Sequence, residues 1–243
     1  MTIVYFSATG NSKYVAMRLS KEGDNLSFIP NLMNENRFEL KDDVVGIVSP
    51  TYSWGLPSIV VDFLSKVKIE ANYVFYVSTY GTTPGFTANM AKKIQPCISA
   101  FYSVRMVDTW TVLFDLSKKK KVERWTKNTE KQIDAIIHMI NERKVGNFMQ
   151  RKMPSLIGKI AYGNYDRMRR TYHFHVENSC IGCGLCARKC PVHAIELKEK
   201  SPVWVKDKCT MCLGCLHRCP KFAIQYGSRT KKHGQYQNPH AKI

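Results

Sequence analysis

No uninterrupted apolar stretch in this chain approaches the roughly 18 residues that a membrane-spanning helix needs. The chain opens with a short apolar run, Ile3 to Phe6, without the basic flank and longer apolar core of a signal peptide. Both absences lead us to expect a cytoplasmic protein. With 44% hydrophobic and 23% charged residues, the composition also excludes a disordered or collagen-like chain.

Acidic residues are scarce, since 19 Asp and Glu stand against 37 Lys and Arg, for a net charge of +18. The excess is confined to one part of the chain, because residues 1–115 carry ten residues of each sign. A basic half of this kind can attract nucleic acid, but the sequence contains no recognised nucleic-acid-binding motif. It can equally attract acidic partner proteins. Nucleic-acid binding is therefore kept as the weakest alternative.

Cysteine is nearly absent outside one window: of nine cysteines, only Cys97 lies outside residues 180–219. We expect Cys97 to be a buried thiol. In a reducing compartment, clustered cysteines ligate metal more often than they form disulfides. The window therefore predicts metal centres.

One motif, Cys-x-x-Cys-x-x-Cys-x-x-x-Cys-Pro, occurs twice in this window with identical spacing. Each run of three close cysteines can wrap one [4Fe-4S] cubane, and the fourth ligand then comes from the other run. One predicted set is Cys180, Cys183, Cys186 and Cys219, and the other is Cys209, Cys212, Cys215 and Cys190. Zinc sites are the alternative, but they usually show separated Cys-x-x-Cys pairs. The double motif resembles bacterial-type ferredoxins with two [4Fe-4S] clusters.

The first half alternates short apolar runs, rich in β-branched and aromatic residues, with segments of helical spacing. The predicted strands are 3–6, 26–29, 44–48, 73–77 and 103–107, and the predicted helices are 11–19, 57–67 and 87–94. This alternation predicts an open, doubly wound α/β fold with a parallel sheet. Ligands of such sheets bind at the carboxyl ends of the strands.

The turn after the first predicted strand has the properties of a phosphate site. It contains Ser7, Ala8, Thr9, Gly10, Asn11 and Ser12. Hydroxyls, an amide and the free N–H groups of a helix start suit a phosphate. The turn lacks the lysine motif of an NTPase, the Gly-x-Gly-x-x-Gly of a dinucleotide fold and the cysteine of a phosphatase loop. We therefore expect it to bind a phosphomonoester without cleaving it.

Two later turns each place an aromatic residue beside a glycine. They contain Pro50, Thr51, Tyr52, Ser53, Trp54 and Gly55 in the first, and Thr79, Tyr80 and Gly81 in the second. Trp54 and Tyr80 could stack on a planar ring, while Gly55 or Gly81 brings a backbone amide to a ring nitrogen. A phosphate beside a planar ring indicates FMN. The alternative is that these aromatic residues only pack the fold.

The phosphate turn together with Pro-Thr-Tyr-Ser-Trp-Gly resembles the flavodoxins over about residues 1–145. That resemblance implies a flavodoxin-like sheet of strand order 2-1-3-4-5 and an FMN stacked between aromatics. The whole chain resembles the single-chain flavodoxin-ferredoxin fusion proteins. We expect a flavodoxin-like FMN domain over 1–145 and a small α+β ferredoxin-like two-cluster domain over 177–227. The residues between them predict a basic linker or arm over 146–176, and those after them predict a flexible basic tail over 228–243.

Between the two motif regions lies a basic connector that begins at Lys118. A helix is predicted to run to about Lys144 with an apolar core stripe formed by Val122, Trp125, Ile133, Ile136, Ile137 and Ile140. The following arm mixes large apolar residues with cations such as Arg151, Lys152 and Lys159. Packing between domains is the favoured interpretation of the arm, and association with an anionic membrane surface is the less favoured one.

A flavin converts between one- and two-electron chemistry, whereas each cubane passes single electrons. The sequence therefore favours an electron-transfer protein that passes electrons between two [4Fe-4S] clusters and an FMN, with redox proteins as partners. The alternative is a flavin-dependent reductase of a small molecule such as a quinone. No general acid stands out in the flavin turns to support that alternative; Tyr52, Tyr80 or Thr82 could donate a proton, but each has an equally good structural role.

Overall fold

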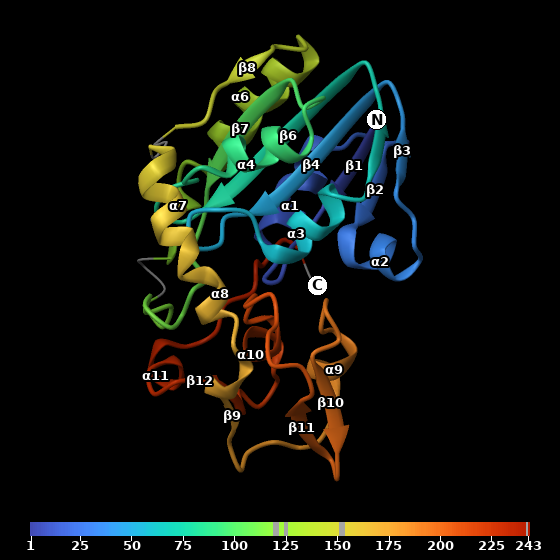
Figure 1. Cartoon of the computed structure of the whole chain (residues 1–243). Helices are drawn as coiled ribbons and strands as arrows, with labels where there is room; N and C mark the ends of the chain where they lie inside the picture. Colours follow the sequence, from blue (N-terminus) through green and yellow to red (C-terminus); the bar gives the residue numbers. More distant parts are fainter. Residues whose placement is uncertain (119–121, 124–125, 151–153, 242) are drawn as a thin grey trace.

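The computed structural model describes residues 1–118, 122–123, 126–150, 154–241 and 243. An α/β unit built around a twisted sheet stands above a smaller unit that contains the clustered cysteines (Figure 1). Trp125, Arg151 and Lys152, named above, lie outside the described residues, as do Lys119, Lys120 and Lys121 of the basic connector.

The main sheet has the strand order β2-β1-β4-β6-β7-β8, and all of its pairs are parallel. Its strands are β1 (Thr2–Tyr5), β2 (Asn25–Phe28), β4 (Val44–Pro50), β6 (Tyr73–Tyr80), β7 (Ala100–Arg105) and β8 (Gly146–Asn147). The first five of these have the predicted order 2-1-3-4-5. Two short strands, β3 (Glu39–Lys41) and β5 (Lys68–Glu70), form a separate parallel pair.

Helices cover both faces of the sheet, which confirms the doubly wound α/β class (Figure 1). They are α1 (Asn11–Leu19), α2 (Ile29–Asn34), α3 (Ser58–Leu64), α4 (Thr87–Ile94) and α6 (Thr129–Asn141). Side chains alternate between the faces with the period of two expected for a strand. Ile3 and Tyr5 pack with α1 and α6, whereas Val4 and Phe6 pack with α3 and α4.

Several element boundaries differ from the prediction; α3 ends at Leu64 rather than at residue 67, and β6 extends to Tyr80 rather than to residue 77. Strand β7 begins at Ala100, which pairs with Phe75, so the strand starts three residues before the predicted 103. Helix α6 begins only at Thr129, yet Ile133, Ile136 and Ile140 are buried against the sheet, as the apolar stripe predicts.

The segment expected to begin a linker at residue 146 instead continues the α/β unit. Strand β8 joins the sheet edge, and Met149 lies in the core. Helices α7 (Ser155–Gly163) and α8 (Tyr165–Met168) follow. Gly158 packs on Phe86, and the Tyr162 hydroxyl donates to Leu56 O at 2.7 Å. Among the described residues, no helix has the length and apolar character needed to cross a membrane.

The smaller unit consists of short elements around the cysteines. They are a 3₁₀ turn (Thr171–His173), β9 (Phe174–Val176), α9 (Leu185–Arg188), β10 (Ile195–Lys198), β11 (Ser201–Trp204), α10 (Gly214–Arg218), β12 (Ile224–Tyr226) and α11 (Thr230–His233). The antiparallel pairs are β10 with β11 and β12 with β9. This arrangement is the small α+β domain expected after the sheet.

Two expectations are wrong. Cys97 is exposed rather than buried, because it lies in the turn between α4 and β7. The segment after residue 227 is packed rather than free: the Leu116 N–H donates to His233 O at 2.7 Å, and Thr230 and Asn238 are buried. Backbone hydrogen bonds to the α/β unit hold this C-terminal segment in place.

Candidate functional site

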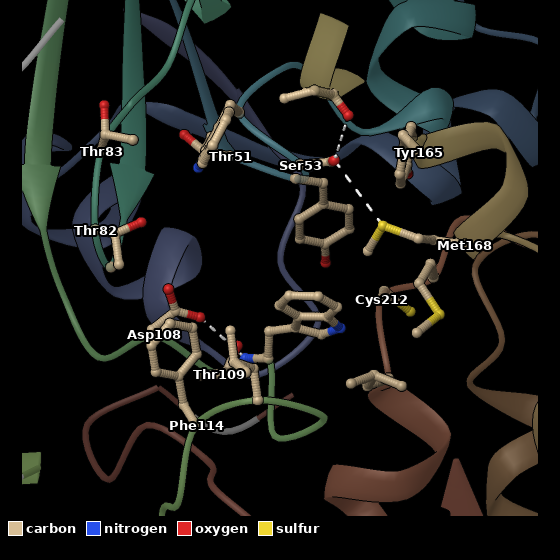
Figure 2. A pocket seen from close by; sticks show the side chains of 18 of the residues that line it. Thr51, Ser53, Thr82, Thr83, Asp108, Thr109, Phe114, Tyr165, Met168 and Cys212 are labelled. Atoms are coloured by element: carbon tan, nitrogen blue, oxygen red, sulfur yellow. Dashed lines mark hydrogen bonds between the residues drawn. The ribbon is translucent and has the colours of Figure 1, made fainter. Parts of the chain in front are cut away.

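A cavity of about 510 Å³ lies where the carboxyl ends of β4, β6 and β7 meet the smaller unit. The turns that follow these three strands form one side, and residues 211–213 of the cysteine segment form another. Figure 2 shows Cys212 across the cavity from Thr82 and Thr83. The cavity therefore lies at the position where doubly wound sheets bind ligands, with a cysteine of the second motif on its wall.

The turn after β4 holds an aromatic side chain at this cavity by a strained backbone. Ser53 and Trp54 both have positive φ, at 46° and 66°. Two hydrogen bonds of 2.9 Å between the backbones of Tyr52 and Gly55 close the turn. Consecutive non-glycine residues in this region cost about 1–3 kcal/mol each and are typical of ligand sites. The backbone of Gly85 lies directly against the backbone of Trp54, and only a glycine fits there, because a Cβ would collide with Trp54 O.

Some of the residues predicted to bind the flavin in these two turns line the cavity, and others do not. Those on its wall are Thr51, Tyr52, Ser53, Trp54 and Gly81. Tyr80 is buried within the protein and Gly55 lies outside the cavity wall, as do Pro50 and Thr79. The Gly55 N–H donates to Tyr52 O and so serves the turn. Trp54 is 36% exposed.

Asp108 is a cavity residue that sequence reasoning missed. It lies three residues beyond β7, and its side chain points into the cavity with that of Thr82 (Figure 2). Its Oδ1 accepts the Trp110 N–H at 3.1 Å. Burial raises the pKa of Asp108 to about 6. Its position in the turn that follows a strand could have marked Asp108 as a candidate ligand-binding residue, but Asp108 belongs to no recognised motif.

Two further features belong to the wall of this cavity. Gly81 packs directly on the Asp108 side chain, so any Cβ at Gly81 would collide with it. The Trp110 Nε1 atom is buried without a hydrogen-bond partner among the described residues. Buried donors are normally satisfied, and Trp110 lines the cavity. An unsatisfied indole N–H is consistent with a ligand acceptor.

The predicted phosphate turn is buried and internally ordered. Gly10 has φ of 97°, and its N–H donates to Ser7 Oγ at 3.1 Å. The Ser12 and Thr79 hydroxyls are hydrogen-bonded at 2.8 Å, which joins this turn to the end of β6. Asn11 Nδ2 donates to Val107 O at 3.1 Å. The structure thus brings Thr79 to the phosphate turn rather than to the cavity at the ends of β4, β6 and β7 (the ring cavity).

The C-terminal segment covers this turn. Tyr236 Oη and Asn238 Nδ2 both approach Asn11 Oδ1, at 3.2 and 3.1 Å, and the Asn238 N–H donates to Thr9 O at 2.7 Å. A Cβ on Gly10 would lie 2.5 Å from the Ala241 carbonyl oxygen. Residues 236–241 therefore pack against the phosphate turn.

The eight clustered cysteines line two separate small cavities, four in each. One small cavity is lined by Cys180, Cys183, Cys186 and Cys219, and a second by Cys190, Cys209, Cys212 and Cys215. Burial raises the pKa of Cys212 to about 11, so its thiol keeps its proton until a metal displaces it. Among the described residues, no three metal-binding side chains converge as a single-ion site does.

Helix α10 of the smaller unit is anchored to the α/β unit. His217 Nδ1 accepts the Tyr236 N–H at 3.2 Å, so Nε2–H donates to Thr109 O at 2.8 Å. Burial lowers the pKa of His217 to about 4, which keeps the ring neutral at neutral pH. Tyr165 Oη donates to Thr210 O at 2.7 Å. These contacts fix the second motif against the ring cavity.

The fold and these sites define an α/β flavoprotein-type unit followed by a cysteine-rich iron–sulfur unit. Residues 2–172 match the family described as a flavodoxin domain, and residues 179–223 match the 4Fe-4S dicluster domain. The chain belongs to the flavodoxin domain family and combines it with a ferredoxin-type domain, as in flavodoxin-ferredoxin fusions. The flavodoxin match extends beyond residue 145, through α7 and α8.

A search of the curated proteins finds no match. Among solved structures, the Trp repressor binding protein from Bacillus subtilis matches with a TM-score of 0.38 and 8% identity. The match covers 60% of this chain and 100% of that one.

The residues present fit the ring portion of a flavin. A volume of about 510 Å³ is within the usual range for small-molecule sites, roughly 300–1,000 Å³. The wall combines aromatic side chains with hydroxyls and one unsatisfied donor. The two domain matches thus imply a flavin and iron–sulfur chemistry in one redox protein.

Proposed function

We propose that this protein passes electrons between two [4Fe-4S] clusters and an FMN within one chain. The observation that carries the proposal is the position of Cys212, which lines both the ring cavity and the cavity of the second cysteine set. A cubane bound by Cys212 would adjoin a ring bound in the larger cavity. Bound flavin would supply the conversion between one- and two-electron chemistry.

In this proposal the residues have distinct tasks. Thr51, Tyr52, Ser53, Trp54 and Gly81 contact the ring, and the turn from Ser7 to Ser12 holds the phosphate. Each cysteine run contributes three ligands to one cluster and its last cysteine, Cys190 or Cys219, to the other. This crossing ties the two motifs together, so neither cluster can be lost without loosening the other.

The iron, sulfide and FMN content of the protein, together with the rate of flavin reduction, tests the proposal. Anaerobically purified protein should contain about eight iron atoms with matching sulfide and one FMN per chain. After rapid photoreduction of the clusters, the flavin should become reduced at a rate that is independent of protein concentration. A rate proportional to protein concentration would show transfer between molecules and contradict the proposal, as would protein that holds zinc but no iron.

Asp108 favours a second candidate function, the reduction of a small molecule such as a quinone. Such a reaction consumes protons, and a carboxyl with a pKa near 6 in the cavity can supply one. Asp108→Asn should then abolish saturable turnover of a small acceptor while leaving transfer from clusters to flavin intact. Reduction of proteins only, unaffected by this substitution, would favour the carrier function.

The redox partners are proposed to be acidic proteins. Residues 116–243 carry 27 Lys and Arg against nine Asp and Glu, and such an excess accelerates association with acidic surfaces. Rising ionic strength should therefore slow electron exchange with an acidic partner. Cytoplasmic location stays a prediction.

A further inference from the structure

Arg218 is a buried cation at the boundary between the two units. It is 8% exposed. Its Nε and Nη2 donate to Ala8 O at 3.1 and 3.0 Å, and its Nη1 donates to Lys189 O at 3.1 Å. No carboxylate pairs with it in the part of the chain that the structure describes. Carbonyl dipoles alone compensate a buried charge incompletely.

The geometry around Arg218 indicates where the missing negative charge would be. A Cβ on Gly214 would lie 2.8 Å from Arg218 Nη2 and 3.5 Å from Cys212 Sγ, so both groups flank the same glycine. The other contact, Lys189 O, directly precedes Cys190. Cys190 and Cys212 belong to one cysteine set. A cubane on four thiolates carries a net charge of about −2.

We propose that the Arg218 guanidinium offsets the negative charge of the iron–sulfur cluster held by Cys190, Cys209, Cys212 and Cys215. This compensation raises the reduction potential of that cluster. The inference rests on the proposed function. Reduction adds one negative charge to the cluster, and a buried guanidinium beside it stabilises that added charge. The same side chain binds Ala8 of the phosphate turn, so one cation joins the cluster nearest the flavin to the flavin domain.

The internal repeat supplies a matched control. Lys189 directly precedes Cys190-Pro191, just as Arg218 directly precedes Cys219-Pro220. Lys189 is exposed, whereas Arg218 is buried. Solvent screens an exposed charge strongly. Removing the Lys189 charge therefore changes the net charge by the same amount without removing a buried cation.

The test is a redox titration of the full-length protein under anaerobic conditions, followed by electron paramagnetic resonance. Three variants are compared with the wild type: R218Q, R218K and K189Q. We expect R218Q to lower the potential of one cluster and to leave the other unchanged. R218K should restore most of the wild-type potential, because it keeps the charge. K189Q should leave both potentials unchanged.

Other results would overturn the inference. They are an R218Q protein with both clusters bound and both potentials unchanged, or an equal shift in K189Q. If R218Q does not retain iron, R218K decides: retained iron supports the role of the charge, and loss in both variants overturns it. A wild-type protein without iron and sulfide would instead overturn the proposed function, and this inference with it.

Discussion

At the scale of single residues, the carboxyl of Asp108 makes stability depend on pH. An Asp of unperturbed pKa 3.8 has its pKa raised to about 6 by burial. As the pH rises between these values, the unfolded chain releases this proton and the folded protein keeps it. The unfolded state then binds fewer protons, so stability falls as the pH rises through the folded pKa.

We therefore predict that Asp108→Asn removes a pH-dependent loss of stability. The free energy of unfolding of the wild type, minus that of the variant, should fall by up to about 3 kcal/mol between pH 4 and pH 7. Denaturant unfolding of both proteins across this range measures the difference. The amide can still accept the Trp110 N–H, so the turn is preserved. A difference that stays constant with pH would contradict the assigned environment.

The second residue-scale prediction concerns the last cysteine of each motif, Cys190 and Cys219. Cys190 shares its set with Cys212, which borders the ring cavity, whereas Cys219 belongs to the other set. Cys190→Ser should therefore abolish rapid cluster-to-flavin transfer. Cys219→Ser should retain it more fully, although each variant loses about half of its iron.

Iron analysis and flash photoreduction of the two variants check this assignment. Cys97→Ser is the control, because Cys97 is exposed and outside both sets. If Cys219→Ser stops the transfer and Cys190→Ser does not, the crossing of ligands is wrong.

At the scale of elements, the C-terminal segment covers the phosphate turn. Its contacts with Thr9, Gly10 and Asn11 are made by residues more than 220 positions away in the sequence. A phosphate that enters from this side must displace the segment. The segment should therefore slow both the binding and the release of FMN.

A chain that ends at Gln237 tests this role, since it lacks Asn238 and Ala241 but keeps Tyr236. We expect faster association and faster dissociation of FMN, measured by stopped-flow quenching of flavin fluorescence. Riboflavin has no phosphate and is the matched ligand, whose rates should change little. Equal acceleration of both ligands would mean that the segment controls the ring cavity rather than the phosphate turn.

The local sequence pattern was sufficient to predict the bounds of some elements, but not the contacts between residues that are distant in the sequence. Helices α1 and α4 begin and end at the predicted residues, because apolar spacing and the preceding turns mark them. The cysteine spacing likewise predicts the two sets that line separate cavities. The covering of the phosphate turn by Tyr236 and Asn238 depends on polar contacts between distant residues. No periodicity marks such contacts, and the same holds for Asp108 beyond β7.

At the scale of the whole molecule, the two units share one cavity wall. Met211, Cys212 and Leu213 come from the second cysteine motif, yet they line the cavity at the end of the sheet. The segment that carries these residues is short, and we expect it to depend on its clusters for part of its order, as small cysteine-rich domains do. Flavin binding and cluster assembly should therefore be coupled.

We predict that removal of iron weakens flavin binding even though no flavodoxin residue changes. Without the clusters, nothing holds Cys209, Cys212 and Cys215 together, and residues 209–219 become less ordered. The wall formed by Met211 to Leu213 then opens. FMN affinity should fall at least tenfold, about 1.4 kcal/mol, when fluorescence titrations compare loaded protein with protein treated with chelator and oxidant. Reconstitution with iron and sulfide should restore the affinity. If the affinity is the same with and without iron, the cavity does not depend on the second unit, and the contacts of His217 and Tyr165 hold that wall without the clusters.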